Sequence, residues 1–285
     1  MLVTLGYVIV VASVFGGFVL AGGHIAAMLQ PLELLMIGGA SFGAFVVGNS
    51  GKALKATMLA LPACFKGSKY NKALYMELMS LLFEILGKVR KEGLMSIERD
   101  IENPSESALF SKYPKVSSDH HLVEFMADYL RLMVSGNMNA FEIENLMDNE
   151  IDTHHHEAEA PAHIVQKVAD GLPAFGIVAA VMGVVHTMES VGIPPAELGK
   201  LIAHALVGTF LGILLSYGMV APLAGLLEQR ASESTKILQC IKVTLLASIN
   251  GYAPSIAVEF GRKVLFSTER PSFTELETHV KQAKS

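Results

Sequence analysis

Four long runs of uncharged, mostly apolar residues constrain what this chain can fold into. The first 32 residues contain no Asp, Glu, Lys or Arg. The runs cover residues 2–21, 34–51, 171–188 and 201–227. A helix rises about 1.5 Å per residue and the hydrocarbon core of a bilayer is about 30 Å thick, so a transmembrane helix needs roughly 20 such residues. The sequence therefore predicts four transmembrane helices, the first two joined by a loop that contains Pro31 and ends at Glu33.

Composition excludes several other classes of protein. Hydrophobic residues make up 51% of the chain and charged residues 17%, against about 25% charged in ordinary soluble domains. The chain is too apolar for a disordered protein, and two cysteines cannot build a disulfide scaffold. A net charge of −5 argues against nucleic-acid binding through bulk charge.

The four runs have two alternative interpretations besides membrane spans. The first run could be a cleaved signal peptide, but no basic segment precedes it and a second apolar run follows it, which argues against this interpretation. The third and fourth runs could be a pair of buried helices in the core of a soluble protein, but their many Gly and Ala residues suit close helix packing in lipid. Membrane spans are the favoured interpretation for all four runs.

Lysine and arginine predict the orientation of the spans. Residues 52–170 hold 13 of them and residues 228–285 hold 8, whereas the two short connections hold none. Positively charged segments stay in the cytoplasm, so both termini are expected there, with Cys64 and Cys240 as free thiols. The expected parts are a transmembrane hairpin at 1–51, a cytoplasmic helical domain at 52–170, two transmembrane helices within 171–227 and a cytoplasmic tail at 228–285.

Residues 52–170 show helical periodicity almost throughout. Apolar residues recur at intervals of three and four in two stripes, Tyr75, Leu78, Leu81, Leu82, Ile85 and Val89, and Leu122, Phe125, Met126, Tyr129, Leu130 and Met133. A third stripe begins at Phe141 and continues through a His-rich stretch toward Gly171. Expected breaks are Gly93, Asn103-Pro104, Tyr113-Pro114 and Ser135-Gly136-Asn137.

The tail is also predicted to be helical. One long helix is expected from about 223 to 249, ended by Asn250-Gly251 and Pro254. A short helix is expected near Ser272, which has capping-box spacing to Glu275. No strand pattern appears, so the predicted fold class is all-α, a polytopic membrane protein with a large helical cytoplasmic loop and a helical tail.

The spans contain few polar groups that could act within a membrane. None has a carboxylate, Lys or Arg near its centre; the polar side chains are His186, His204, Ser41, Thr209, Ser216 and Tyr217. A proton carrier needs a group that titrates within the bilayer. If the protein conducts ions, we expect a partner to supply the carboxylate. For the two histidines, placement at the membrane interface is favoured over a role in a proton relay.

Other motifs are less specific. Gly39 and Gly43, and Gly208 and Gly212 with Ala205 one turn before, have the spacing that lets helix backbones approach closely, either within the chain or between chains. The run His154-His155-His156 with His163 could suggest a metal site, but consecutive His side chains point in different directions. Phosphate loops, nucleophile elbows and zinc-protease motifs are absent, so no enzyme activity is predicted.

Several motifs resemble the MotA family of flagellar motor stator proteins. They are ALVGTFLGIL at 205–214 followed by Pro222, PAFG at 173–176, ERDIENP at 98–104, NGYAP at 250–254 and AVEFGRK at 257–263. The resemblance implies a bacterial inner-membrane protein, without a cofactor, that forms a ring of five copies around a MotB dimer. MotB supplies the essential membrane Asp, and ion flow drives force on the rotor protein FliG.

The resemblance also implies roles for individual residues. Arg90 and Glu98 match the charged pair that contacts the rotor, and without the resemblance both would be interpreted as a solvated helix face. Pro173 and Pro222 match the prolines that couple ion flow to motion; a proline lacks an N–H and bends or weakens a helix, so a plain kink is the alternative. Thr209 matches the threonine that lines the ion path.

The coupling ion is predicted from Ala180. Sodium-driven relatives carry Thr at this position, and Na⁺ needs several oxygen ligands, so Ala180 favours H⁺. Three other functions are alternatives to a stator subunit. A TolQ/ExbB-like proton-channel subunit, which energises outer-membrane processes, has three spans. A solute transporter needs a central substrate-binding group, and a structural scaffold would tolerate loss of Thr209 and Pro222.

Overall fold

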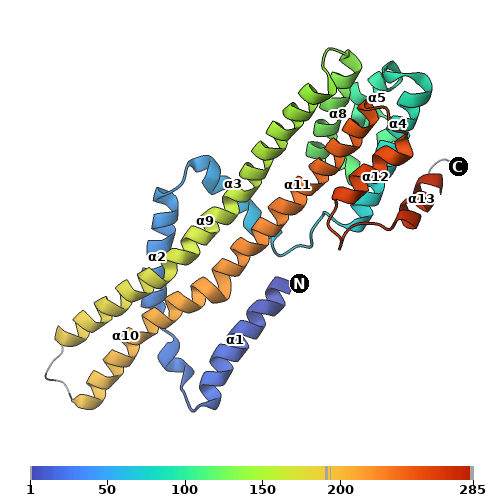
Figure 1. The fold of residues 1–285 in the computed structure, drawn as a ribbon. Coiled ribbons are helices and arrows are strands. Elements are labelled where there is room, and N and C mark those ends of the chain that lie inside the picture. The colour runs from blue at the N-terminus through green and yellow to red at the C-terminus, as the bar shows by residue number, and fades with distance from the viewer. Residues whose placement is uncertain (1, 190–191, 193, 283–285) are drawn as a thin grey trace. The chain divides into compact units, whose positions relative to one another are not determined.

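The computed structural model describes residues 2–189, 192 and 194–282. Within these residues the chain is helical and contains no strand, which confirms the all-α prediction. The chain divides into two compact units (Figure 1). Unit 1 comprises the described residues up to Gly67 together with Glu157–Gln229, and unit 2 comprises Ser68–His156 and the described residues from Arg230 onward.

Four helices of the described residues are long and apolar enough to cross a membrane, and unit 1 contains two of them whole and part of each of the other two. Its elements are α1 (Leu2–Leu20), the 3₁₀ helix η1 (Ile25–Met28), α2 (Pro31–Val47), α3 (Gly51–Ala63), α10 (Pro195–Leu215) and the π-helical turn η4 (Ser216–Val220). It also includes the C-terminal part of α9 (Ala140–Glu189) and the start of α11 (Ala221–Ile249). The predicted number of spans is therefore confirmed. The expected connection after Glu189 lies partly outside the described residues.

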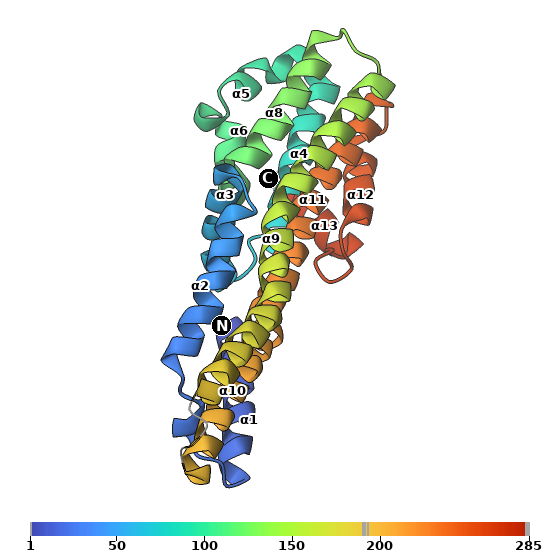
Figure 2. The same cartoon turned by 90° about the vertical axis from the view of Figure 1, so that its left-hand side faces the viewer.

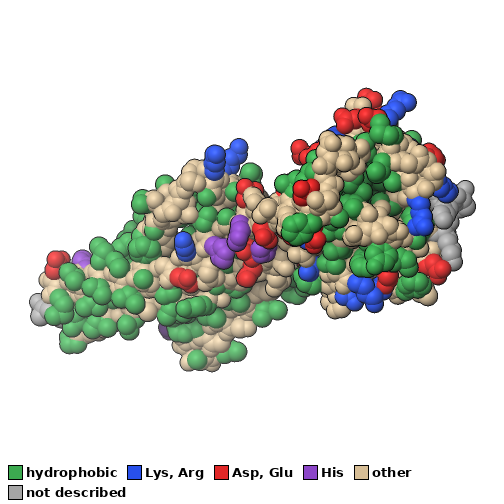
Figure 3. Space-filling view, turned by 45° about the horizontal axis from the view of Figure 1, so that its top comes forward, with side chains coloured by type: hydrophobic (Ala, Val, Ile, Leu, Met, Phe, Trp, Pro, Cys, Tyr) green, Lys and Arg blue, Asp and Glu red, His purple; other side chains and the backbone are tan. Residues whose placement is uncertain are grey.

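Large apolar side chains cover the surface of these helices (Figure 3). On α1 no residue is buried. Ile177, Val181 and Val185 on α9 and Leu206 on α10 are about half exposed or more. A soluble monomer rarely exposes so much contiguous apolar surface, and a lipid environment removes the cost of that exposure. The surface agrees with a multi-pass membrane protein.

The second span begins earlier than predicted. The sequence predicts a loop that includes Pro31 and ends at Glu33, whereas α2 begins at Pro31 and contains Glu33 in its first turn. The physical reason is that proline suits the first helical position, where its missing N–H costs nothing and its φ angle is already helical. Glu33 is consequently buried, with 7% of its surface exposed.

Unit 2 is a helical bundle with its own apolar core. Its elements are α4 (Lys72–Glu92), η2 (Leu94–Ile97), α5 (Glu98–Glu102), η3 (Pro104–Glu106), α6 (Ala108–Ser111), α7 (Pro114–Ser117), α8 (His120–Ser135), α12 (Pro254–Val264) and α13 (Phe273–Gln282), with the remaining parts of α9 and α11. The apolar stripes predicted on α4 and α8 form this core; of their twelve residues only Val89 is not fully buried.

Local signals fix the helix ends of unit 2 as predicted. Gly93 has φ +86° and follows α4, while Gly136 is left-handed and ends α8. Both angles favour glycine. Pro104 and Pro114 each begin a short helix, because proline suits the first helical turn. Gly251 at φ +85° follows the end of α11.

The C-terminal helix α13 is capped and tied to α4. The Ser272 N–H donates to Glu275 at 2.7 Å and the Glu275 N–H donates to Ser272 Oγ at 3.2 Å, which confirms the predicted capping box. Glu275 also accepts from Lys72 at 2.7 Å. The Lys72 bond and the capping bonds lower the pKa of Glu275 to about 2. No disulfide joins Cys64 and Cys240 in the part of the chain described.

Candidate functional site

The helices α9 and α10 meet through small residues in unit 1 and run side by side in two views (Figures 1 and 2). A Cβ atom added to Gly176 would lie 2.8 Å from the carbonyl oxygen of Gly208, and one added to Gly212 would lie 2.7 Å from the carbonyl oxygen of Leu172. Both distances are too short for a methyl group. The packing role predicted for Gly208 and Gly212 is confirmed within the chain, whereas nothing lies within 4 Å of a Cβ at Gly39 or Gly43.

The close contact between α9 and α10 brings Ala180 near Thr209, the two residues that the resemblance links to ion flow. A Cβ on Gly208 would lie 3.2 Å from the backbone nitrogen of Ala180, so Ala180 lies beside the residue that precedes Thr209. Ala180 and Thr209 are both half-buried. Residues 29 positions apart in sequence therefore meet at one level of the α9–α10 pair.

A buried carboxyl group from α2 reaches the same level. Glu33 Oε2 lies 3.2 Å from the Cβ position of Gly208, and this oxygen has no hydrogen-bond partner among the residues that the structure describes. The Ser41 hydroxyl, two helical turns further along α2, is also buried without a partner. Sequence reasoning missed Glu33 because it was placed in a loop; the signal that could have found it is Pro31 at the start of a helix.

Pro173 interrupts the hydrogen bonding of α9. In an α-helix the N–H of residue 173 would donate to the carbonyl of Ala169, but proline has no N–H. The Ser216 hydroxyl donates to the Ala169 carbonyl instead, at 2.6 Å. Ser216 and Ala169 are both fully buried. The bond therefore joins α9 to η4 where Pro173 weakens α9.

Pro222 lies two residues after the end of the π-helical turn η4, as the second residue of α11. In this turn the N–H of Ala221 donates to the carbonyl of Ser216, five residues back. The carbonyl of Met219 accepts from the Tyr7 hydroxyl at 2.9 Å, so α1 also holds the turn. Pro222 itself is exposed, whereas Pro173 is half-buried. Pro173 lies inside α9, and Pro222 is the second residue of α11, which continues the helix from α10 through η4.

Arg90 and Glu98 lie close together in sequence at one end of unit 2. Arg90 belongs to the last turn of α4 and Glu98 begins α5, with the Gly93 turn and η2 between them. Both side chains are exposed, and no ion pair joins them among the described residues. Their charges are therefore available to solvent or to another protein.

The segment that carries Glu98 is anchored by Asp100. Lys88 donates to Asp100 at 2.8 Å and Ser107 donates to it at 2.6 Å. Burial alone would raise the pKa of Asp100, but these two hydrogen bonds and the Lys88 charge outweigh it, so the pKa lies below its usual value. The anchor ties α5 to α4.

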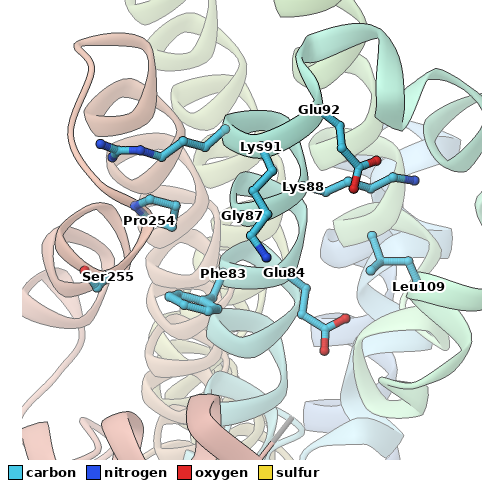
Figure 4. Close-up of a pocket in the computed structure, with 10 residues that line it drawn as sticks. Phe83, Glu84, Gly87, Lys88, Lys91, Glu92, Leu109, Pro254 and Ser255 are labelled. Carbon is cyan, nitrogen blue, oxygen red and sulfur yellow. The ribbon is translucent and has the colours of Figure 1, made fainter. Parts of the chain in front are cut away.

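A hollow of about 520 Å³ lies beside Arg90, between α4, α6 and α12 (Figure 4). Its charged side chains come from α4 and have both signs: Glu84, Lys88, Arg90, Lys91 and Glu92. Leu109 and Pro254 add apolar walls. Mixed charges of this kind do not select one small anion or cation, and the hollow offers no arrangement typical of catalysis.

The histidines have hydrogen-bonding partners. His154 Nε2 lies 3.2 Å from Ser234 Oγ, and His155 Nδ1 lies 3.0 Å from Thr235 Oγ1, both on α11. Within the described residues no three His, Cys, Asp or Glu side chains form a group suited to a metal ion. In unit 1, His186 lies 3.8 Å from Glu189 and His204 is half-buried on α10; the choice between interfacial placement and proton relay stays a prediction.

Comparison with known proteins identifies the family. The profile "Motility protein A N-terminal" matches residues 4–93, and the "MotA/TolQ/ExbB proton channel family" matches residues 117–240. Motility protein A of Salmonella typhimurium is 59% identical over 285 residues, which are 100% of this chain and 97% of the relative. The chain belongs to the motility protein A family. Motility protein A of Escherichia coli is 58% identical with the same coverage.

Solved structures agree with this membership. The flagellar MotAB stator complex from Bacillus subtilis matches with a TM-score of 0.75 and 25% identity, covering 96% of this chain and 98% of that one. MotAB of C. jejuni matches with a TM-score of 0.78 and 21% identity, covering 95% and 98%. The predicted resemblance is confirmed, and the fold of this chain matches that of a chain in the solved MotAB structures.

Proposed function

We propose that this member of the motility protein A family is a stator subunit of the bacterial flagellar motor, which converts ion flow into torque. The observation that carries the proposal is the full-length identity of 58–59% to two motility proteins A. The proton channel family match at 117–240 includes Ala180 and Thr209 and supports the ion-flow role. Nothing in this arrangement points to an enzyme.

The proposed ion path follows the α9–α10 pair at the level of Ala180 and Thr209. Residues 171–188 and 201–227 of these spans contain no Asp or Glu, and Glu33 reaches the crossing only from the end of α2. Because the apolar runs of α9 and α10 carry no carboxylate of their own, we assign the group that titrates at the centre of the membrane to another chain. The solved relatives are complexes with MotB, and we assign the essential membrane Asp to a MotB dimer.

The proposed assembly is a ring of copies of this chain, five in number, around the MotB helices in the inner membrane. The exposed apolar surface of α1 and α9 suits both lipid and neighbouring subunits. Lys and Arg are concentrated in residues 52–170 and 228–285, which supports a cytoplasmic location for both termini and for unit 2.

Arg90 and Glu98 are proposed to pass force to the rotor protein FliG. Their side chains are exposed and of opposite charge, and exposed charges steer association while adding little to fold stability. Pro173 and Pro222 are proposed to couple ion flow to the motion of the ring, because each lies where a long helix is weakened.

Deletion of the gene tests the proposal. We expect cells that still assemble flagella but do not swim, with swimming restored by the full chain expressed together with its MotB partner. Swimming that is unaffected, in a strain without a second stator set, would contradict the proposal. An intact flagellum with normal motility but loss of outer-membrane integrity would favour the TolQ/ExbB-like alternative, which shares the family match at 117–240.

A further inference from the structure

Two prolines in unit 1 weaken different helices, Pro173 in α9 and Pro222 in α11. One residue, Ser216, forms hydrogen bonds close to both of them. Pro173 on α9 leaves the carbonyl of Ala169 without its usual N–H donor. Within a membrane such a carbonyl has no water to bind, and Ser or Thr side chains from a neighbouring helix are one way to satisfy it. Here the donor is the Ser216 hydroxyl, at 2.6 Å.

The position of Ser216 in its own helix is equally specific. It is the first residue of the π-helical turn η4, and its carbonyl accepts the N–H of Ala221, the residue before Pro222. Single π-helical turns inside α-helices are rare and occur frequently at functional sites. Ser216 thus bonds through its side chain to the Pro173 region and through its backbone to the turn that leads into Pro222.

A second helix holds the other side of this turn. The Tyr7 hydroxyl of α1 donates to the carbonyl of Met219 at 2.9 Å. Val10 of α1 also lies against Gly218, where an added Cβ would be 3.1 Å from the Val10 side chain. Pro222 has no N–H to donate to the carbonyl of Gly218, four residues back. The Tyr7 bond goes to the next carbonyl, that of Met219, so it ties the turn to α1 without replacing the donor that Pro222 lacks.

We propose that Ser216 is a positioning residue that links the two proline hinges, with Tyr7 anchoring the turn between them to α1. A bend of α9 at Pro173 then either moves η4, through the Ser216–Ala169 bond, or breaks that bond. Ser216 does not touch the ion in this proposal; it sets whether the two hinges move together. The inference rests on the proposed stator function, because it takes the prolines as the elements that couple ion flow to motion.

A double-mutant cycle tests the bond itself. In the purified complex with its membrane partner, Ser216→Ala is expected to lower the Tm, because the buried Ala169 carbonyl loses its donor. In the Pro173→Ala background the same substitution is expected to have no effect, because Ala at 173 restores the helical N–H. A Tm loss of equal size in both backgrounds would overturn the proposal.

Ser41→Ala is the matched control for this cycle. Ser41 is also a buried serine of unit 1, but its hydroxyl has no partner. Removing that hydroxyl is expected to leave the Tm unchanged or to raise it, in both backgrounds. A Tm loss as large as that of Ser216→Ala would mean that burial of any serine, and not the Ala169 bond, explains the result, and would also overturn the proposal.

Rotation of single motors tests the link between the hinges. Ser216→Ala is expected to lower the speed of a small bead on the flagellar hook by about 2- to 10-fold, the change in equilibrium that loss of one hydrogen bond produces, while Ser216→Thr, which keeps the hydroxyl, retains most of the speed. Unchanged speed in Ser216→Ala would overturn the inference. Failure of the unsubstituted chain to turn the motor would instead overturn the proposed stator function.

Discussion

Gly176 and Gly212 pack backbone to backbone where α9 meets α10, with the Cβ position of Gly212 only 3.0 Å from the Cα of Gly176. Gly176→Ala or Gly212→Ala should therefore separate the two helices. We expect a loss of about 1–3 kcal/mol in the free energy of unfolding, as for other overpacked sites, together with loss of swimming. Thermal unfolding of the purified complex and a motility assay measure the two effects.

Gly225→Ala on α11 is the control for this prediction. Nothing lies within 4 Å of a Cβ at Gly225, and alanine is favoured over glycine in a helix by about 1 kcal/mol. Unchanged or higher stability is expected. If Gly225→Ala and Gly212→Ala reduced stability equally, close approach of α9 and α10 would not be the cause.

The helices and their ends were predictable because their signals are local. Gly93, Gly136 and Pro114 act on the backbone within a few residues, and the α4 and α8 stripes follow from the helical period. The burial of Glu33 was not predicted, because a single carboxylate beside an apolar run is ordinarily placed in water. Its position depends on where α2 begins.

The partner of Ser216 depends on tertiary structure. The sequence shows that Ser216 is one of several residues with a hydroxyl group in the predicted spans. It also shows that Pro173 leaves the Ala169 carbonyl without its helical donor. What sequence reasoning could not supply is which hydroxyl from another helix reaches that carbonyl. In the same way, the spacing of Gly208 and Gly212 predicts close packing but not that Gly176 and Leu172 are the contacts.

Asp100→Asn should loosen the segment that carries Glu98. The carboxylate accepts hydrogen bonds from Lys88 and Ser107, and bonds to charged groups contribute about 1.5–3 kcal/mol, less here because the Lys88 side chain is 34% exposed. Faster amide hydrogen exchange is expected in η2 and α5. Asp128→Asn, which removes an exposed ion pair with Arg131, should have little effect.

The same carboxylate predicts a pH dependence. The pKa of Asp100 is lower in the folded chain than in the unfolded chain, so its stabilising contribution is complete above the unfolded pKa and is lost as the pH falls through the folded pKa. The protection factors of the amides in η2 and α5, which correct for the slower intrinsic exchange in acid, should fall in acid in the unsubstituted protein and change less with pH in Asp100→Asn. Identical acid responses would contradict the role of Asp100.

Cys240 should resist thiol reagents in the folded protein. It lies fully buried in the unit 2 core, and burial raises the pKa of its thiol to about 12. The reactive thiolate is therefore scarce at any pH between 7 and 9. Maleimide labelling, followed by mass spectrometry, is expected only after unfolding. Rapid labelling of Cys240 at pH 8 in the intact complex would contradict the burial.

Arg90→Ala and Glu98→Ala should lower the torque of the motor without lowering the stability of the fold. Both side chains are exposed and neither pairs with the other within the described residues, so a change in unfolding free energy of less than about 0.5 kcal/mol is expected. Single-motor torque is expected to fall if these charges meet the rotor. Lys263→Ala, which removes an exposed cation of α12, serves as the control and should leave torque unchanged.

The coupling ion can be tested at Ala180. A Na⁺ ion that gives up its water needs several oxygen ligands, and Ala180 offers no side-chain oxygen beside Thr209, whereas proton transfer requires only water and a carboxylate. Replacing Na⁺ by K⁺ in the medium, at constant ionic strength, should therefore leave swimming speed unchanged, while a protonophore should stop it. Swimming that stops on removal of Na⁺ alone would show sodium coupling. Ala180→Thr is the matched variant: it adds one oxygen at the crossing, and a dependence of its swimming speed on Na⁺ would identify this level of the α9–α10 pair as the ion path.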